Sequence, residues 1–377
     1  APLSLSAACP GPPENSYSRS CEMRGAVLGT VNHAALHDME IFKEFFDYDF
    51  GPICERLHVA GFSMAEDYQG NSLESRVYNA RICARICELA VKLGQAATAE
   101  EMKAVLTDFY REYGVGKLGL HKCFRIGRDE DGRACIQPVP RIAHVRLEDL
   151  VGYEIPKEKL INNTDAFVAG RAANNCLLFG DAGTGKSSCI KAIANEYYDK
   201  GLRVIEVYKH QFQDLNRIIS QIKGRNYKFI IFMDDLSFED FEIEYKYLKA
   251  VLEGGLEKKP ENVLIYATSN RRHLIRENYG DKTEDGSLSE ARQDMHTSDT
   301  VQEKLSLVYR FGVTIYFGAP DKKQFQGIVK VLAERNGVNM PQEELFLAAN
   351  KWELAHGGLS GRTAQQFIDY LKGSGDL

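Results

Sequence analysis

The sequence lacks several features that would assign it to whole classes of protein. None of its apolar runs approaches the roughly 20 residues that a membrane-spanning helix needs, and its nine cysteines form no CxxC pair. Basic residues are not in excess: 47 lysines and arginines face 53 aspartates and glutamates, for a net charge of −6. These absences argue against a membrane span, a zinc ribbon and a mainly electrostatic grip on nucleic acid, while leaving a local basic face open.

The cysteines fit no metal site either. Cys83 and Cys87 lie four residues apart and could share one helix face, but zinc needs further ligands at suitable spacing and the sequence offers none. We therefore expect buried thiols in a reducing compartment, the cytoplasm. The first residues, APLSLSAACPGPPENS, show no basic segment before an apolar run. This pattern does not favour a secretory signal, and its proline, serine and glycine content predicts a flexible tail over residues 1–20.

The length of 377 residues, with 44% hydrophobic and 27% charged residues, is typical of a soluble chain with two or three domains. Residues 21–145 predict a mainly helical N-terminal domain, because ESRVYNARICARICELAVKLG has its apolar residues at helical spacing. Thr98 followed by Glu101 predicts a capping box. The later run CFRIGRDEDGRACIQPVP predicts a hairpin within the same domain.

From Asn174 onward, apolar runs alternate with helical patterns. The runs NCLLF, RVIEV, KFIIFM, VLIYAT and VTIYF contain little polarity, which is typical of parallel strands covered on both faces. We expect helices between them over Lys186–Asp199, Gln211–Ile222, Phe241–Glu253 and roughly Val301–Tyr309, and only helices from Asp321 to Leu371. The predicted fold class is therefore α/β, with a parallel sheet between helices.

The stretch LLFGDAGTGKSS follows the first of these runs. Its residues Gly180, Gly185, Lys186 and Ser187 fit the phosphate-loop pattern G-x-x-x-x-G-K-[ST], with a strand before it and a helix after it. Glycines let backbone N–H groups turn toward phosphate oxygens, and the helix N-terminus adds further donors. The lysine would neutralise the β- and γ-phosphates, and the serine would offer a hydroxyl to Mg²⁺. The alternative, a glycine turn with an exposed lysine, fits this context poorly. The predicted nucleotide-binding residues are Gly180, Asp181, Ala182, Gly183, Thr184, Gly185, Lys186, Ser187 and Ser188.

Two more strands end in polar residues. KFIIFMDDLSFED carries Asp234 and Asp235 at the carboxyl end of its strand, the edge where ligands bind in such sheets. We expect Asp234 to hold Mg²⁺ with Ser187, and Asp235 to orient or deprotonate the attacking water. In VLIYATSNRRHLI the strand ends at Thr268, Ser269 and Asn270. The neutral amide of Asn270 could position that water.

This order of motifs, closing with LSLVYRFGVTIYF, resembles an AAA+ P-loop ATPase. The resemblance implies that Asn270 is the sensor 1 residue. It implies that Arg310 is an arginine finger that reaches a neighbouring subunit's site, and that Arg362 in LSGRTAQQFIDYL is the sensor 2 residue of a C-terminal helical lid. In AAA+ proteins the adenine pocket falls at positions that match Val151, Gly152 and Tyr153.

The resemblance is specific to one AAA+ subgroup, whose members are catalogued as predicted ATPases of unknown function. It is carried by the stretches AANNCLLFGDAGTGKSS, FIIFMDDLSFED and YLKAVLEGGLEKKPENVLIYATSNRRHLI. It covers about Leu147 to the C-terminus. The boundaries that follow are a P-loop ATPase domain over residues 146–318 and a lid over residues 319–377. One departure concerns the usual Asp-Glu pair: here it is Asp234-Asp235, whose second carboxylate is shorter by one methylene, so hydrolysis could be slow.

The function predicted is Mg²⁺-dependent ATP binding and hydrolysis, coupled to movement of the lid and of neighbouring subunits in an oligomer, by analogy a ring, often of six. Its target could be protein, as in a remodeller, or nucleic acid, as in a loader. A nucleotide-gated scaffold that hardly hydrolyses is a third hypothesis. A P-loop kinase acting on a small molecule is a fourth, and it would not need Arg310 from a neighbour.

Overall fold

The structure is a computed structural model. It describes residues 15–24, 29–58, 80–139, 142–238, 243–253, 260–270 and 307–374. The chain divides into two compact units. Unit 1 runs to Lys122 and includes Pro138–Arg141 and Gly224–Asn226; unit 2 is the rest. None of the helices in the described ranges combines the length and the apolar character needed to cross a membrane.

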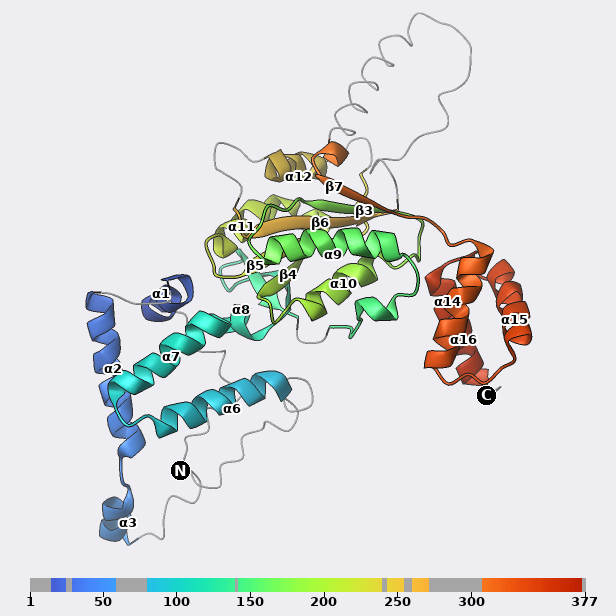
Figure 1. The fold of residues 1–377 in the computed structure, drawn as a ribbon. Helices are drawn as coiled ribbons and strands as arrows, with labels where there is room; N and C mark the ends of the chain where they lie inside the picture. Colours follow the sequence, from blue (N-terminus) through green and yellow to red (C-terminus); the bar gives the residue numbers. More distant parts are fainter. Residues whose placement is uncertain are drawn as a thin grey trace, which may run out of the picture. The chain divides into compact units, whose positions relative to one another are not determined.

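Unit 1 is helical in its described part (Figure 1). The Thr98 hydroxyl accepts from the N–H of Glu101 at 3.2 Å, and Glu101 accepts in turn from the N–H of Ala97 at 2.6 Å, which confirms the predicted start of a helix there. The apolar core of the unit gathers along this helix, from Met102 to Tyr110. The helices of the unit are α1 (Ser16–Arg24), α2 (Thr30–Asp47), α3 (Gly51–Leu57), α6 (Ala80–Gln95), α7 (Ala99–Tyr113) and α8 (Gly116–Leu120).

Helix α1 lies partly within the segment that the sequence predicted as a tail. Asn15 and Ser18 cap it reciprocally: the N–H of Ser18 donates to Asn15 Oδ1 and the N–H of Asn15 donates to Ser18 Oγ. Tyr17 is buried, and its hydroxyl is 2.7 Å from that of Thr107 on α7. Composition does not reveal this anchoring, because it depends on a few buried residues of the helix, with Cys21 in the same apolar cluster as Tyr17. Residues 1–14 of the predicted tail lie outside the described residues.

Unit 2 is built on a seven-stranded sheet with the order β2-β1-β4-β5-β6-β3-β7. The six strands from β1 to the edge strand β7 in this order are parallel, each to its neighbours. The five strands that the sequence predicted after Asn174 are confirmed. The strands are β1 (Cys123–Arg128), β2 (Ala134–Pro138), β3 (Cys176–Gly180), β4 (Leu202–Glu206), β5 (Lys228–Met233), β6 (Val263–Ser269) and β7 (Val313–Phe317).

The predicted hairpin is present as β1 and β2, but it belongs to this sheet. Phe124 pairs with Ile205 of β4, and the Arg128 guanidinium bonds to the Asp214 carboxylate beyond β4 at 2.8 Å. The sheet of unit 2 therefore begins at Cys123, upstream of residue 146, where the sequence set the start of the ATPase domain. The hairpin's turn chemistry is local, whereas its partner strand lies some 80 residues away, so no local pattern reveals this pairing.

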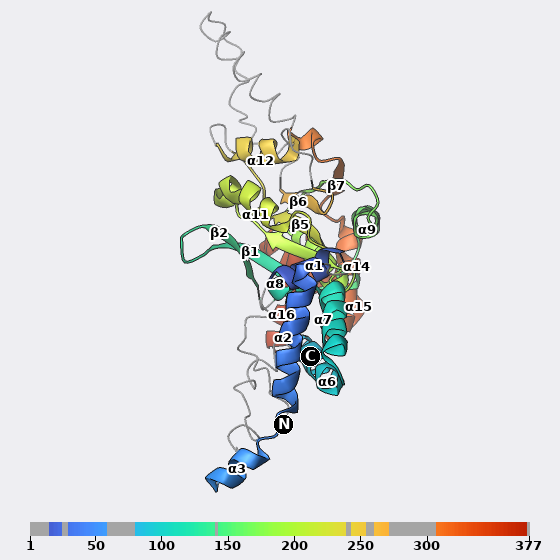
Figure 2. The same ribbon diagram turned by 90° about the vertical axis from the view of Figure 1, so that its left-hand side faces the viewer.

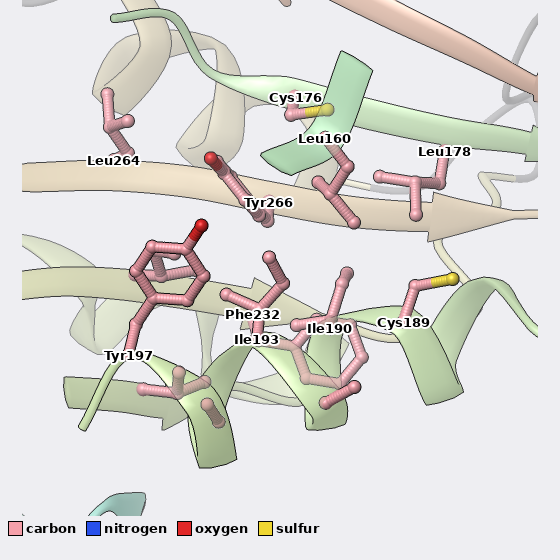
Figure 3. Packing of buried hydrophobic residues seen from close by; sticks show 14 of the residues in the cluster. Leu160, Cys176, Leu178, Cys189, Ile190, Ile193, Tyr197, Phe232, Leu264 and Tyr266 are labelled. Atoms are coloured by element: carbon pink, nitrogen blue, oxygen red, sulfur yellow. The ribbon is translucent and has the colours of Figure 1, made fainter. Parts of the chain in front are cut away.

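Helices cover both faces of the sheet (Figures 1 and 2). Alternate residues of β5 show this: Ile230 and Phe232 join the cluster under α9 and α10, whereas Phe229 and Ile231 are buried on the other face, since successive side chains of a strand alternate. Figure 3 shows the cluster under α9 and α10, in which Ile190 and Ile193 of α10, and Tyr197 directly after it, pack toward β5 and β6. The covering elements are η1 (Leu147–Asp149), α9 (Glu154–Val168), α10 (Lys186–Glu196), η2 (Lys209–Asp214), α11 (Leu215–Ile222) and α12 (Glu244–Glu253).

After β7 the regular elements of the described residues, up to 374, are all helices, as the sequence predicted: α14 (Lys322–Arg335), α15 (Gln342–Ala355) and α16 (Gly361–Ser374). Asp321 caps α14 through a reciprocal pair with Gln324. The three helices share a separate apolar core around Phe325 and Phe367. We call this bundle the lid. Its α14 is tied to η1, because the Arg335 guanidinium donates to the carbonyl oxygens of Asp149 and Glu148.

Candidate functional site

The phosphate loop lies between the end of β3 and the start of α10, at the carboxyl edge of the sheet. Its glycines adopt backbone angles that other residues rarely take: φ is +133° at Gly180, +76° at Gly183 and +90° at Gly185. Gly180 also touches the β7 backbone so closely that a Cβ there would lie 2.1 Å from the carbonyl oxygen of Phe317. The glycines of the motif are therefore required by the loop's shape.

Lys186 begins α10 and is 6% exposed. Its Nζ donates to the carbonyl oxygens of Gly180 at 3.0 Å and of Asp181 at 2.5 Å, within the loop itself. Burial lowers the pKa of Lys186, and the carboxylates of Asp181, Asp235 and Asp234 act in the opposite direction. The amine is thus held next to the loop, among acidic groups.

The first acid of the pair faces the phosphate loop. Phe232 on β5 packs toward α10, so Asp234, two residues on, points to the same side. Its Oδ1 accepts from the hydroxyl of Ser187 at 2.5 Å and from that of Thr268 at 2.6 Å. A hydroxyl and a carboxylate side by side are hard oxygen donors of the type Mg²⁺ prefers. Ser187 and Asp234 therefore fit the ion that the sequence predicted.

The second acid, Asp235, lies at the same edge of the sheet but has a left-handed backbone conformation. Asp235 has φ of +51°, one of three residues other than glycine with positive φ in the described part of the chain. Its Oδ1 accepts from Nδ2 of Asn270 at 2.8 Å, and its backbone N–H donates to the Thr268 hydroxyl at 2.9 Å. The structure thus brings together Asp235 and Asn270, both exposed to solvent, as a directly hydrogen-bonded carboxylate and amide. Their predicted action on water stays a prediction.

The lid contacts the phosphate loop directly. The backbone N–H of Arg362 donates to the carbonyl oxygen of Gly183 at 3.2 Å, and the Ser360 hydroxyl packs against the same glycine. The Arg362 charge also acts on Lys186, whose pKa it lowers. At the hinge between sheet and lid, the N–H of Ala319 donates to the Asp181 carboxylate at 2.6 Å. The lid therefore contacts the phosphate loop at Gly183, and the segment that leads from β7 to the lid contacts it at Asp181.

The residues predicted for an adenine pocket lie between η1 and α9. Val151 packs against the lid core. Tyr153, with φ of +60°, packs against the sheet core and donates its hydroxyl to the carbonyl oxygen of Gly318 at 2.9 Å. With Gly152, whose φ is +80°, these residues link the lid to the sheet beside the loop. Their role in base binding stays a prediction.

Arg310 lies elsewhere, directly after the helical residues 307–309. Its guanidinium forms an ion pair with the carboxylate of Glu253, the last residue of α12. About a quarter of the Arg310 side chain is exposed, at 27%. Its predicted action on a neighbouring subunit stays a prediction too.

Sequence reasoning missed three contributors to the site: Thr268, Ser360 and the N–H of Ala319. The sequence indicates Thr268 only as part of a strand end. The bond from Ala319 to Asp181 joins positions 138 residues apart, and such side chain to backbone contacts have no local signature. Ser360 could have been found as a helix cap, because its hydroxyl accepts from the N–H of Thr363 at 3.0 Å.

A family model described as "Protein of unknown function (DUF815)" matches residues 120–375. The chromosomal replication initiator protein DnaA of Bordetella pertussis is 26% identical over 187 residues, covering 48% of this chain and 35% of the relative. The replication factor C large subunit of Staphylothermus marinus is 34% identical over 77 residues, covering 19% of this chain and 18% of the relative.

Among solved structures, the RuvB Holliday junction branch migration motor of Thermotoga maritima has a TM-score of 0.40 and 16% identity, covering 60% of this chain and 64% of that chain. The present chain spans about a third of the length of DnaA, 35%. The family match covers more than half of the chain and includes the phosphate loop, the acidic pair and the lid. The chain therefore belongs to the DUF815 family, and it has the AAA+ P-loop fold, with a C-terminal helical lid and a mainly helical N-terminal region.

Proposed function

We propose that this protein binds ATP with Mg²⁺ and hydrolyses it, and that the lid transmits the reaction to neighbouring subunits of an oligomer. One observation carries the proposal: the hydroxyl of Ser187 in the phosphate loop lies 2.5 Å from the carboxylate of Asp234, the residue after β5, directly beside the Asp235–Asn270 pair. A simple glycine turn would not need a carboxylate from another strand at its serine.

Each residue has a separate task in this proposal. The amides of the phosphate loop and Lys186 bind and neutralise the phosphates. Ser187 and Asp234 would hold Mg²⁺, which when bound offsets charge on the phosphate oxygens. Asp235, positioned with Asn270, accepts a proton from water. The water oxygen bonds to the γ-phosphorus as the bond to the β–γ bridging oxygen breaks, and ADP and phosphate leave.

Coupling to the lid is supported by the contacts of the loop. The Arg362 N–H donates to the carbonyl oxygen of Gly183, and the Ser360 hydroxyl lies close to the same glycine. Phosphates bound in the loop would lie beside these lid contacts. The single tryptophan of the chain, Trp352, lies in the lid, stacked on His356 at 3.8 Å between ring centroids. Its fluorescence would report a nucleotide-dependent lid movement.

Hydrolysis is tested by phosphate release from Mg²⁺-ATP. Asp235→Asn keeps the shape and loses the proton acceptor, so the rate should fall at least about 100-fold while ATP still binds. Asp131→Asn in the exposed β1–β2 turn is the matched control and should leave the rate unchanged. If wild-type protein binds ATP but releases no phosphate, the nucleotide-gated scaffold replaces hydrolysis. The short carboxylate of Asp235, engaged by Asn270, is the observation that favours this second candidate.

The oligomer is tested through Arg310. A trans-acting arginine requires two subunits at one site. Mixtures of Lys186→Ala and Arg310→Ala subunits should therefore recover activity that neither variant has alone. No recovery would contradict a shared site and would favour a small-molecule kinase acting within one chain.

A nucleic-acid target is favoured by the names of two partial relatives, a replication initiator and a replication factor subunit. The net charge of −6 gives it no general support. Stimulation of phosphate release by DNA would favour a loader. The target itself is best sought by capturing partners with Asp235→Asn protein.

We propose the cytoplasm as the location. Burial raises the pKa of the Cys176 and Cys189 thiols to about 12, so these cysteines behave as inert apolar side chains. Such thiols suit a reducing compartment.

A further inference from the structure

Thr268, the next-to-last residue of β6, contacts three consecutive residues of the turn that follows β5. Its hydroxyl donates to Asp234 Oδ1 at 2.6 Å and accepts from the N–H of Asp235 at 2.9 Å. Its carbonyl oxygen accepts from the N–H of Leu236 at 2.7 Å. The side chain is 1% exposed. One buried residue therefore holds the whole turn that carries the acidic pair.

The sheet register explains why Thr268 can do this. Met233 on β5 is paired with Ala267 on β6, so the next positions along the two parallel strands are Asp234 and Thr268. Tyr266 points into the cluster beneath α10, and Thr268, two residues on, points to the same face. The hydroxyl of Thr268 is thereby directed to the side on which α10 begins with Lys186 and Ser187.

Asp235 needs such support because of its backbone. On an extended strand it would point to the face opposite Asp234. Instead φ of +51° ends the strand and leaves the carboxylate beside Asn270. Left-handed angles are unfavourable for residues with a Cβ, although aspartate tolerates them better than most. They persist where surrounding contacts hold them, and here Thr268 accepts from the N–H of Asp235 and from that of Leu236.

We propose that Thr268 is a positioning residue for the reaction: its hydroxyl fixes the turn so that the short Asp235 carboxylate reaches the attacking water. The functional part of this inference rests on the proposed hydrolysis. Thr268 itself touches neither phosphate nor water in this role; it acts through Asp234 and Asp235. Displacing a catalytic group by about 1 Å can lower a rate about 100-fold, so loss of the hydroxyl should be visible in the turnover.

The structural part is tested by hydrogen exchange on the full chain. Thr268→Val keeps the shape and removes the hydroxyl, so the amide of Asp235 should exchange faster. The amide of Leu236 should stay protected, because its acceptor is the backbone carbonyl of residue 268. The peptide over residues 233–238 should therefore gain one rapidly exchanging amide. Thr268→Ser should resemble wild type.

Two further variants keep the test decisive. Thr164→Val is the matched control: Thr164 on α9 is equally buried, and its hydroxyl bonds to the carbonyl oxygen of Leu160 and the Tyr266 hydroxyl, away from the acidic pair. It should leave the exchange of residues 233–238 and the turnover unchanged. If Thr268→Val does not fold, the pair Thr268→Ser and Thr268→Ala, which differ by the hydroxyl alone, replaces it.

The functional part is tested by kinetics. For Thr268→Val we expect kcat to fall about 10- to 100-fold and KM for Mg²⁺-ATP to rise by a smaller factor, about three- to fivefold, because the hydroxyl bonds to Asp234. The affinity for ADP without Mg²⁺ should not change, since the phosphate loop does not involve this hydroxyl. Thr268→Ser should recover most of the rate. A merely structural role would instead lower the folded fraction and spare kcat per folded molecule.

The outcomes separate this inference from the proposed function. Unchanged exchange at residues 233–238, or faster exchange with unchanged kcat, would overturn the role of Thr268 and leave hydrolysis standing. If wild-type protein binds ATP without hydrolysing it, the proposed hydrolysis is refuted. The role of Thr268 is then tested by amide hydrogen exchange and by the gain in ATP affinity that Mg²⁺ produces. That gain should shrink at least about threefold in Thr268→Val, because Asp234 loses a bonded neighbour; an unchanged gain would overturn the inference there as well.

Discussion

Gly180→Ala should destabilise unit 2 much more than an ordinary glycine substitution. The added Cβ would lie 2.1 Å from the carbonyl oxygen, 2.7 Å from the carbonyl carbon and 3.0 Å from the nitrogen of Phe317. These are backbone atoms of β7, and Gly180 is paired with Phe317 in the sheet. The clash cannot be relieved by turning a side chain, so one strand must move by roughly 1 Å or more to restore normal contacts.

The magnitude follows from two costs. At φ of +133° a residue with a Cβ costs about 1–3 kcal/mol. Overpacking against an immobile neighbour costs about another 1–3 kcal/mol. Together the free energy of unfolding should fall by about 2–6 kcal/mol. Gly170→Ala is the matched control, because Gly170 has φ of +75° and a methyl group added there would meet nothing within 4 Å, so only about 1 kcal/mol of backbone strain is expected.

The assay is urea unfolding of both variants, followed by circular dichroism and by the fluorescence of Trp352 in the lid. Nucleotide affinity of the folded Gly180→Ala fraction should fall as well, since the phosphate loop begins at this residue. If the two alanine variants lose equal stability, the close approach of β3 and β7 is not the reason for glycine at position 180.

The remaining predictions concern stability and pH. Arg203 is buried between the rings of Tyr198 and Tyr227, 4.2 and 4.3 Å from their centroids, and donates to two carbonyl oxygens. Arg203→Met should therefore lower the free energy of unfolding in urea by about 2–4 kcal/mol. Arg217→Met, at an exposed position, is the control, and equal unfolding midpoints for the two variants would contradict the prediction. Burial raises the pKa of Tyr110 and of Tyr153 to about 12. Between about pH 10 and pH 12 the unfolded chain gives up phenol protons that the folded chain keeps, so stability should fall as pH rises through this window. Absorbance at 295 nm should then show tyrosine ionisation together with loss of helix, whereas ionisation completed near pH 10 in the folded state would refute it.

Much of unit 2 could be predicted from sequence because its signals are local. The five apolar runs are strands, and the Ser187 hydroxyl bonds to Asp234, the two residues that the sequence predicted as Mg²⁺ ligands. Each of these depends on a short stretch whose composition reports burial on both faces or a helix start. Asp235 and Asn270 lie together because the carboxyl ends of parallel strands meet at one edge of the sheet; their action on water stays a prediction.

What could not be predicted depends on pairing between distant segments. The addition of β1 and β2 to the sheet is set by contacts with β4, and the docking of α1 by the buried Tyr17. The left-handed turn at Asp235 arises because Thr268 comes into register beside it. None of these has a local pattern, since register and docking are decided by the packed chain as a whole.

The central claim is that a nucleotide's phosphates bind the loop around Lys186, with Mg²⁺ between Ser187 and Asp234. Isothermal titration of ATP into the purified protein, with and without Mg²⁺, tests it most directly. The account predicts binding that Mg²⁺ strengthens and that Lys186→Ala weakens at least about 100-fold, while Lys191→Ala, an exposed lysine on the same helix, binds as wild type does. Equal heats for wild type and Lys186→Ala, or no binding by wild type, would contradict it.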